Sequence, residues 1–132
     1  MRERLVWAGA KCGTAHLRDP LPISIWEDGC IWRSEAINAL DKRNRPYRVA
    51  YLSGHTMAQR AAIEADLAIA PLPRSYVHND MVILGEKEGL PPLGSFDIRL
   101  IMNDKVSRPI QAVADSIRNA FRDVAQVGAD RG

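Results

Sequence analysis

The stretch YRVAYLSGHT, residues 47–56, contains the pattern that decides the fold. Its first six residues, Tyr47–Leu52, are of the kinds that favour β-strands, and a short polar turn follows them. Thr56 and Gln59 then have the spacing of a capping box, with Thr56 as the N-cap and the Gln59 side chain reaching back to it. The stretch therefore predicts a strand, a turn and a helix that runs to about Ala65.

The same order of elements occurs in the residues that precede this stretch. Pro22–Trp26 predicts a strand, and the sequence EDGC at residues 27–30 predicts a turn. From Ile31 to about Arg43, apolar residues recur at helical spacing and form one stripe. Two successive strand–turn–helix units are typical of α/β proteins.

Shorter apolar segments extend this pattern in both directions. The predicted strands are Leu5–Ala8, Leu67–Ala70 and Met81–Leu84. Pro71 and Pro73 are expected to stop the strand Leu67–Ala70. Phe96–Met102 alternates apolar and polar residues, which is typical of a half-buried strand. We therefore expect an α/β fold with a mostly parallel sheet flanked by helices.

The last helix has an apolar stripe of its own. Ser107 is the predicted N-cap, and Pro109 lies in the first turn, where proline is tolerated. The stripe consists of Ile110, Val113, Ile117, Phe121 and Val124. If nothing covered it, this stripe would expose more apolar surface than a soluble monomer usually tolerates. We therefore expect self-association, by packing or by exchange of this helix between chains.

Composition excludes several classes of protein. The chain has 132 residues, of which 46% are hydrophobic and 26% are charged, enough for one domain with a modest core. A net charge of +2 is too small to indicate nucleic-acid binding by itself. No apolar run reaches the roughly 18 residues that a membrane span needs, and we find no secretory signal. Cys12 and Cys30 are therefore expected to be reduced thiols of a cytoplasmic protein.

The turns after the two predicted strands are the candidate binding site. In α/β sheets, ligands bind at the carboxyl ends of strands, where helix N-termini present unpaired N–H groups. Gly29 and Gly54 would let the backbone come close to a bound group. These N–H groups favour an anionic ligand, whereas Asp28 argues against an anion near the first turn. The candidate binding residues are Ser53, Gly54, His55, Thr56, Cys30 and Ile31.

Reactive side chains have both a catalytic and an ordinary interpretation. His55 could titrate near neutral pH, and Cys30 could be a nucleophile with His55 as its base. No motif places an acidic partner beside them, and the chain contains neither a nucleophile elbow nor a P-loop. We therefore expect an exposed histidine, a small residue at a helix start, and no catalysis or cofactor.

Metal and phosphate sites have only weak support. Cys12 and His16 have a spacing that could bind a metal from a helix, but Gly13 predicts a loop there, and we expect no metal site. A basic group, Lys42 with Arg43, Arg45 and Arg48, could bind phosphate. Cations also complement the dipole at the end of a helix, and we interpret the group in that way.

Five segments of the sequence resemble a known family. They are residues 20–33, 47–55, 65–74 and 89–93 and the final helix after Ser107. In order and spacing they are similar to the effector-binding domain of LysR-type transcriptional regulators. The resemblance extends from about Leu5 to about Val124.

The resemblance implies a fold and a division of the chain. It implies a Rossmann-like subdomain of the type 2 periplasmic-binding-protein-like fold. Residues 1–104 would be the second effector-binding subdomain, with crossover strands at about 4–8 and 96–102 that lie side by side and antiparallel. Residues 105–127 would be a helix that returns to a first subdomain absent from this chain, and 128–132 a disordered tail. Nothing in the chain resembles a helix-turn-helix.

The resemblance also implies a function. The chain would be the effector-sensing part of a regulator that forms homo-oligomers and contacts DNA only through a domain absent here. An independent small-solute-binding module is one alternative. A small α/β enzyme that uses Cys30 or Ser53 is another.

Overall fold

The computed structural model describes the backbone of residues 1–129 and the side chains of residues 1–123. The chain forms two compact units. Residues 4–95 make up the larger unit, and residues 1–3 belong with the segment that starts at Phe96.

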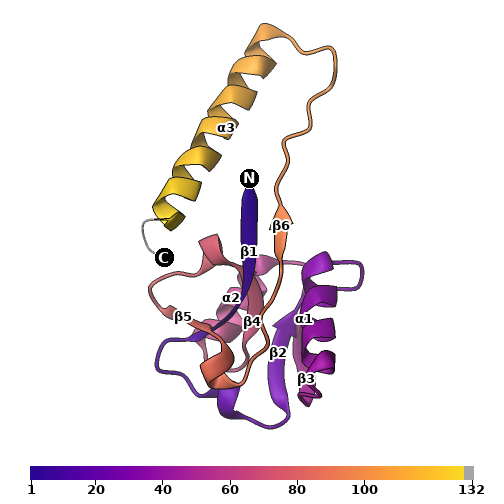
Figure 1. The fold of residues 1–132 in the computed structure, drawn as a ribbon, viewed down its shortest axis with the longest axis vertical. Coiled ribbons are helices and arrows are strands. Elements are labelled where there is room, and N and C mark those ends of the chain that lie inside the picture. The colour runs from indigo at the N-terminus through magenta and orange to yellow at the C-terminus, as the bar shows by residue number, and fades with distance from the viewer. Residues whose placement is uncertain (130–132) are drawn as a thin grey trace. The chain divides into compact units, whose positions relative to one another are not determined.

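Strand β1 lies between two neighbouring strands of the larger unit. β1 (Arg2–Ala10) pairs with β4 (Ala70–Pro73) along one edge and with β5 (Met81–Leu84) along the other, both antiparallel. Figure 1 shows β4 and β5 beside the labelled β1. Because both neighbours run against β1, they run in the same direction as each other.

A second pair of strands extends this sheet. β2 (Leu21–Ile25) and β3 (Tyr47–Leu52) are parallel, with a register shift after Ile23. The Ser24 amide donates to the Ile69 carbonyl at 2.8 Å, immediately before β4. The order across the unit is therefore β3-β2-β4-β1-β5.

The expectation of a mostly parallel sheet was wrong in one respect. The sheet is mixed, because β1 runs against both of its neighbours. β4 is connected to β5 without an intervening long helix, so both strands need an antiparallel partner between them.

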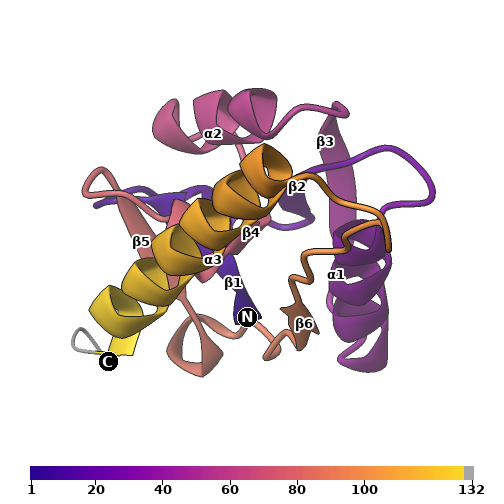
Figure 2. The same ribbon diagram turned by 90° about the horizontal axis from the view of Figure 1, so that it is seen from above.

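A helix covers each face of the sheet. α1 (Ile31–Lys42) follows β2, and α2 (Thr56–Glu64) follows β3. Figure 2 shows the two helices on different sides of the strands. Trp7 belongs to the core cluster that contains Leu40 of α1, whereas its neighbour Ala8 belongs to a cluster with Ile63 of α2. Successive strand residues point to opposite faces, so the clusters lie on opposite sides of the sheet.

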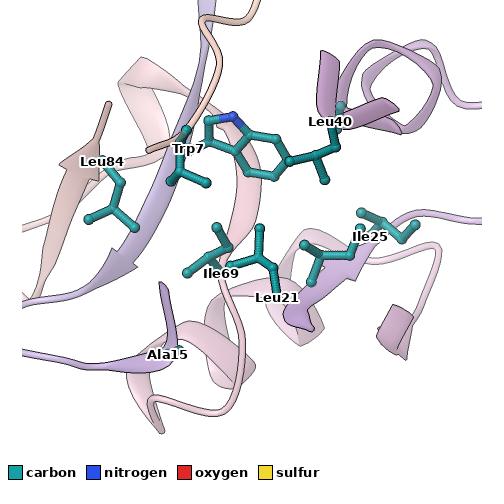
Figure 3. Close-up of a cluster of buried hydrophobic side chains, with 10 residues drawn as sticks. Trp7, Ala15, Leu21, Ile25, Leu40, Ile69 and Leu84 are labelled. Carbon is teal, nitrogen blue, oxygen red and sulfur yellow. The ribbon is translucent and has the colours of Figure 1, made fainter. Parts of the chain in front are cut away.

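The core under α1 is built around one tryptophan. Trp7 is only 2% exposed, and its indole lies between Leu84 of β5 and Leu40 of α1 in Figure 3. Its Nε1 donates a hydrogen bond to the Pro91 carbonyl at 3.0 Å, so the polar end of the ring is also satisfied. Trp7 is therefore a packing residue that also fixes the loop after β5.

The prolines after residue 69 do not stop a strand, as the sequence had suggested. Pro71 and Pro73 lie inside β4, opposite Trp7 and Leu5 of β1. The Ile69 amide donates toward β2, and with period two the proline nitrogens face the same side. β2 does not pair beyond Ile69 there, so the missing N–H groups cost no ladder hydrogen bond.

A carboxylate anchors the loop after β1. Asp66, with φ 52°, accepts hydrogen bonds from the Thr14 amide at 2.9 Å and the Ala15 amide at 3.0 Å. These bonds hold the start of the short 3-10 helix Ala15–Leu17. Hydrogen bonding from Thr14, offset in part by desolvation, lowers the pKa of Asp66. Gly13 is required nearby, since a Cβ atom there would lie 2.4 Å from an Asp66 oxygen.

Two more 3-10 turns flank β5. They are Arg74–Tyr76 and Glu86–Glu88.

The smaller unit begins with a short strand. β6 (Ser95–Asp97) pairs with β1, and Met1 and Ile98 exchange hydrogen bonds at 2.9 and 2.7 Å. This reciprocal exchange is an antiparallel pattern. It involves residues that precede the predicted crossover strand Leu5–Ala8, which itself pairs with β4. The predicted strand to Met102 was too long, however, because β6 ends at Asp97. Ile101 is consequently 90% exposed.

The apolar stripe of the final helix is exposed to solvent. α3 (Arg108–Ala129) contains Ala114, which is buried, while Ile110 and Val113 are 53% and 59% exposed. Ile117 and Phe121 are each 38% exposed. The side chain of Val124 lies outside the described residues, as does the end of the predicted tail, 130–132. The helix continues to Ala129, past the predicted end at residue 127. In the described part of the chain, no helix has the length and apolarity needed to cross a membrane.

Candidate functional site

The two predicted turns lie next to each other at the carboxyl ends of β2 and β3. The Ser53 amide donates to the Ile25 carbonyl at 3.1 Å, which continues the parallel pairing into the second turn. A Cβ atom built on Gly54 would lie 3.8 Å from both oxygens of the Glu27 carboxylate. The structure thus brings together the turn 26–30 and the turn 53–55, which are far apart in sequence.

The start of α2 differs from the predicted capping box. His55 is the N-cap and Thr56 is the first helical residue, and within the described chain no side chain caps this helix end. The Ser53 hydroxyl instead accepts a hydrogen bond from the His55 amide at 3.2 Å. Gln59 cannot reach back as predicted because its side chain points into the core.

Gln59 is a buried polar residue that connects both strand ends. Its exposed fraction is 0%. Nε2 donates to the Ile25 carbonyl at 3.0 Å and to the Ser53 carbonyl at 2.9 Å. Its Oε1 accepts a hydrogen bond from the hydroxyl of Ser24, which is also buried. One signal for this role was available from the sequence: Gln59 lies three and four residues before Ala62 and Ile63, on the buried side of α2.

The turn before α1 is held by an arginine. Arg33 donates to the Trp26 carbonyl at 3.0 Å and forms an ion pair with Asp28 at 3.0 Å. Trp26 packs edge-to-face against Trp32, with ring centroids 5.0 Å apart. The sequence did not single out Arg33, because its partners become close only when the turn folds back over the helix.

The remaining candidate residues differ in how accessible they are. Cys30 is the N-cap of α1, half-buried, and packs against the cluster under α2. Ile31 is 68% exposed, and both Gly54 and His55 are exposed. Cys30 is therefore largely part of the packing beneath the turn, whereas the others offer surface to a ligand.

Charges near the site have opposing effects on an anion. The first N–H groups of α2, those of Thr56 and Met57, have no intrahelical acceptor because of their position in the helix. They favour an anionic group. The exposed carboxylate of Glu27 lies beside Gly54 and disfavours one at that position.

The other sequence candidates have structural roles. Arg43 pairs with Glu86 at 2.6 Å; hydrogen bonding to Glu86 raises the pKa of Arg43, and hydrogen bonding from Arg43 lowers the pKa of Glu86. Arg45 donates to the His16 carbonyl at 3.2 Å. The described residues contain no group of three or more histidine, cysteine or acidic side chains that could hold a metal ion.

Comparisons with known proteins agree with this fold. No family model matches the sequence. The HTH-type transcriptional regulator DgdR of Burkholderia cepacia is 34% identical over 119 residues, 89% of this chain and 40% of that protein. The chain therefore spans less than half the length of this curated relative.

Solved structures give the same result at low sequence identity. Full-length HypT of Salmonella typhimurium, a hypochlorite-specific LysR-type transcriptional regulator, matches with a TM-score of 0.64 and 15% identity. That match covers 90% of this chain and 44% of HypT. The regulatory domain of Synechocystis PCC6803 CcmR, solved in complex with 2-PG, matches with a TM-score of 0.59 and 16% identity. It covers 91% of this chain and 64% of that domain. At these identities the similarity establishes the fold.

Proposed function

We propose that this chain is part of a LysR-type regulatory domain and that it senses a small-molecule effector at the carboxyl ends of β2 and β3; the 34% identical transcriptional regulator and the regulatory domains of the same fold support this. The observation that supports this most is the pairing of the two turns. The Ser53 amide, just after β3, bonds the last carbonyl of β2, and Gly54 lies close to the Glu27 carboxylate. The starts of both helices therefore lie at one edge of the sheet. Open α/β sheets bind ligands at such edges.

The proposed effector site consists of Ser53, Gly54, His55, Thr56, Cys30 and Ile31. The free N–H groups of α2 would bind an acceptor of the effector, such as a carboxylate. Glu27 restricts that group to the α2 side of the turn, away from Gly54. The CcmR structure holds 2-PG, which supports a small ligand for domains of this fold.

The site acts by binding and not by catalysis. The relatives are transcriptional regulators, and Cys30, the candidate nucleophile, is half-buried and packs against the cluster under α2. The effector would stabilise one arrangement of the regulatory domain over another and so shift the assembly on DNA. DNA would be contacted by a part of the regulator outside this chain, in the cytoplasm.

The remainder of the regulatory domain would cover α3. This chain spans 64% of the CcmR regulatory domain, so more than a third of such a domain lies outside it. Within the smaller unit, a groove of about 700 Å³ is lined by the apolar side chains of Ile98, Leu100, Ile117 and Phe121 together with four arginines, Arg2, Arg99, Arg118 and Arg122. We propose that the absent first subdomain packs against this face, and that a second copy does so when the chain is alone.

A bulky substitution in the site tests the proposed function. In an intact regulator that carries this segment, Ser53→Trp should abolish the effector response and leave DNA binding unchanged. The response is read from a reporter gene on the regulator's own promoter, with the most active member of a panel of small carboxylic acids. Asp41→Trp places the same ring at the exposed far end of α1 and is the control. A wild-type response in Ser53→Trp would refute the site.

A further inference from the structure

A closed ring of hydrogen bonds fixes the backbone of Ser53. The Ser53 amide donates to the Ile25 carbonyl at 3.1 Å. Gln59 Nε2 donates to that same carbonyl at 3.0 Å and to the Ser53 carbonyl at 2.9 Å. The Ser53 amide is thereby bonded to the end of β2 directly, and the Ser53 carbonyl is connected to it through the Gln59 side chain.

We propose that Gln59 is a positioning residue that sets the geometry of the two turns of the effector site. This inference rests on the proposed function for its biological meaning, although the ring itself does not. Gln59 touches no ligand in this proposal and acts through Ser53. A ligand that binds the second turn would meet a turn already held in one conformation, so less binding energy is spent on ordering it.

The chemistry of the ring requires an amide at this position. Only a group with two N–H donors and an oxygen acceptor can bind Ile25, Ser53 and the Ser24 hydroxyl together. Methionine would fill a similar volume without these bonds, and it would leave buried polar groups unsatisfied. A residue needed only for packing would therefore be apolar on this buried side of α2.

Backbone hydrogen exchange measured by NMR separates positioning from general stability. The Ser53 amide reports on the ring, whereas the Ile69 amide, which donates to the Pro22 carbonyl at 3.0 Å, reports on the centre of the sheet. In the 132-residue chain, Gln59→Met should speed exchange at Ser53 about tenfold relative to Ile69. Gln111→Met is the matched control, because in the described chain the Gln111 side chain bonds only its helix neighbour Asp115.

Two further variants keep the test decisive if Gln59→Met does not fold. Ser24→Ala removes the hydroxyl that donates to Gln59 Oε1 but keeps the bonds from Gln59 Nε2 to Ile25 and Ser53. The exchange rate of the Ser53 amide should therefore change less than twofold relative to that of Ile69. In Gln59→Glu, the introduced carboxyl can donate one hydrogen bond when protonated and none when ionised. Relative exchange at Ser53 should then rise with pH and approach the wild-type value at low pH.

The wild-type chain, measured over the same pH range, corrects for the other groups that titrate or carry charge nearby. These are Glu27, the Asp28–Arg33 pair and His55 on the two turns, and the Arg60–Glu64 pair on α2.

The outcomes distinguish this inference from the proposed function. Equal acceleration at Ser53 and Ile69 in Gln59→Met, or a flat pH profile in Gln59→Glu, would show that Gln59 only packs. The reporter assay with Ser53→Trp tests effector binding separately and does not depend on the exchange rates. Faster exchange at Ser53 in Gln59→Met, together with a wild-type response in Ser53→Trp, would support the hydrogen-bond ring and refute the effector site.

Discussion

Residues 4–95 and the helix α3 differ in how far they bury their apolar side chains. The larger unit buries apolar residues on both faces of its sheet, including Trp7 under α1 and Ile63 under α2. In α3, Ala114 is buried, whereas Ile110 and Val113 are more than half exposed. The first segment thus has its own core, and the second has an apolar stripe that needs a covering surface.

Removing the centre of the core should have the largest effect on stability. Trp7→Ala deletes a ring that is 2% exposed and a hydrogen bond to Pro91, and it should lower the free energy of unfolding by about 3–5 kcal/mol. Urea unfolding followed by circular dichroism measures this change. A loss below about 1 kcal/mol would contradict a core centred on Trp7.

The Asp66 anchor should give the next largest effect and a defined pH dependence. Because the folded-state pKa is lowered, the anchor stabilises the fold above the ordinary aspartate pKa, and this stabilisation is lost as pH falls through the lowered value. Asp66→Asn should cost about 1–2 kcal/mol at neutral pH. Unfolding measured from pH 7 to pH 2 should show wild type and Asp66→Asn converging at the acid end. Parallel curves would contradict the lowered pKa.

Substitutions on α3 should affect association rather than folding. Phe121→Glu places a charge on a side chain that is 38% exposed, so unfolding should change by less than about 1 kcal/mol. The self-association expected of the isolated chain should be lost, as measured by sedimentation velocity at increasing concentration. Asn119→Glu adds the same charge at an exposed position of α3 that does not line the groove, and it is the control. A wild-type chain that stays monomeric at high concentration would refute the proposed interface.

The smallest effect is expected at Thr56. A capping role would make Thr56→Ala cost about 1 kcal/mol, but Thr56 is the first helical residue and does not cap α2. We expect a change within about 0.5 kcal/mol in the same urea measurement. A larger loss in the free energy of unfolding would support the capping box that the sequence predicts.

Sequence patterns were most reliable where a local signal was complete. The bounds of β3 and β5 agree with the predicted strands, since turn residues bracket a short apolar run on both sides. α1 begins at the predicted Ile31. The prediction was wrong at β4, where prolines were taken as a stop although their nitrogens face a side without a pairing strand.

The candidate site could be predicted in part. Adjacent parallel strands place their carboxyl ends at one edge, so the pairing of the two turns followed from the order of elements alone. Gln59 and Arg33 were missed as structural residues of this site. Their partners are the carbonyls of Ile25, Ser53 and Trp26, and no residue type marks a carbonyl that will need a donor.

The sequence by itself determined the alternation of strands, turns and helices and the resemblance to a LysR-type effector domain. Both depend on periodicity and on residue order, which are local properties of the chain. Only the tertiary structure decided that β1 runs against β4 and β5, and that Gln59 closes a ring at Ser53 instead of capping α2. These features depend on hydrogen bonds between backbone groups that are far apart in sequence. Which groups bond is decided by strand pairing, and the pairing is complete only when the whole sheet has formed.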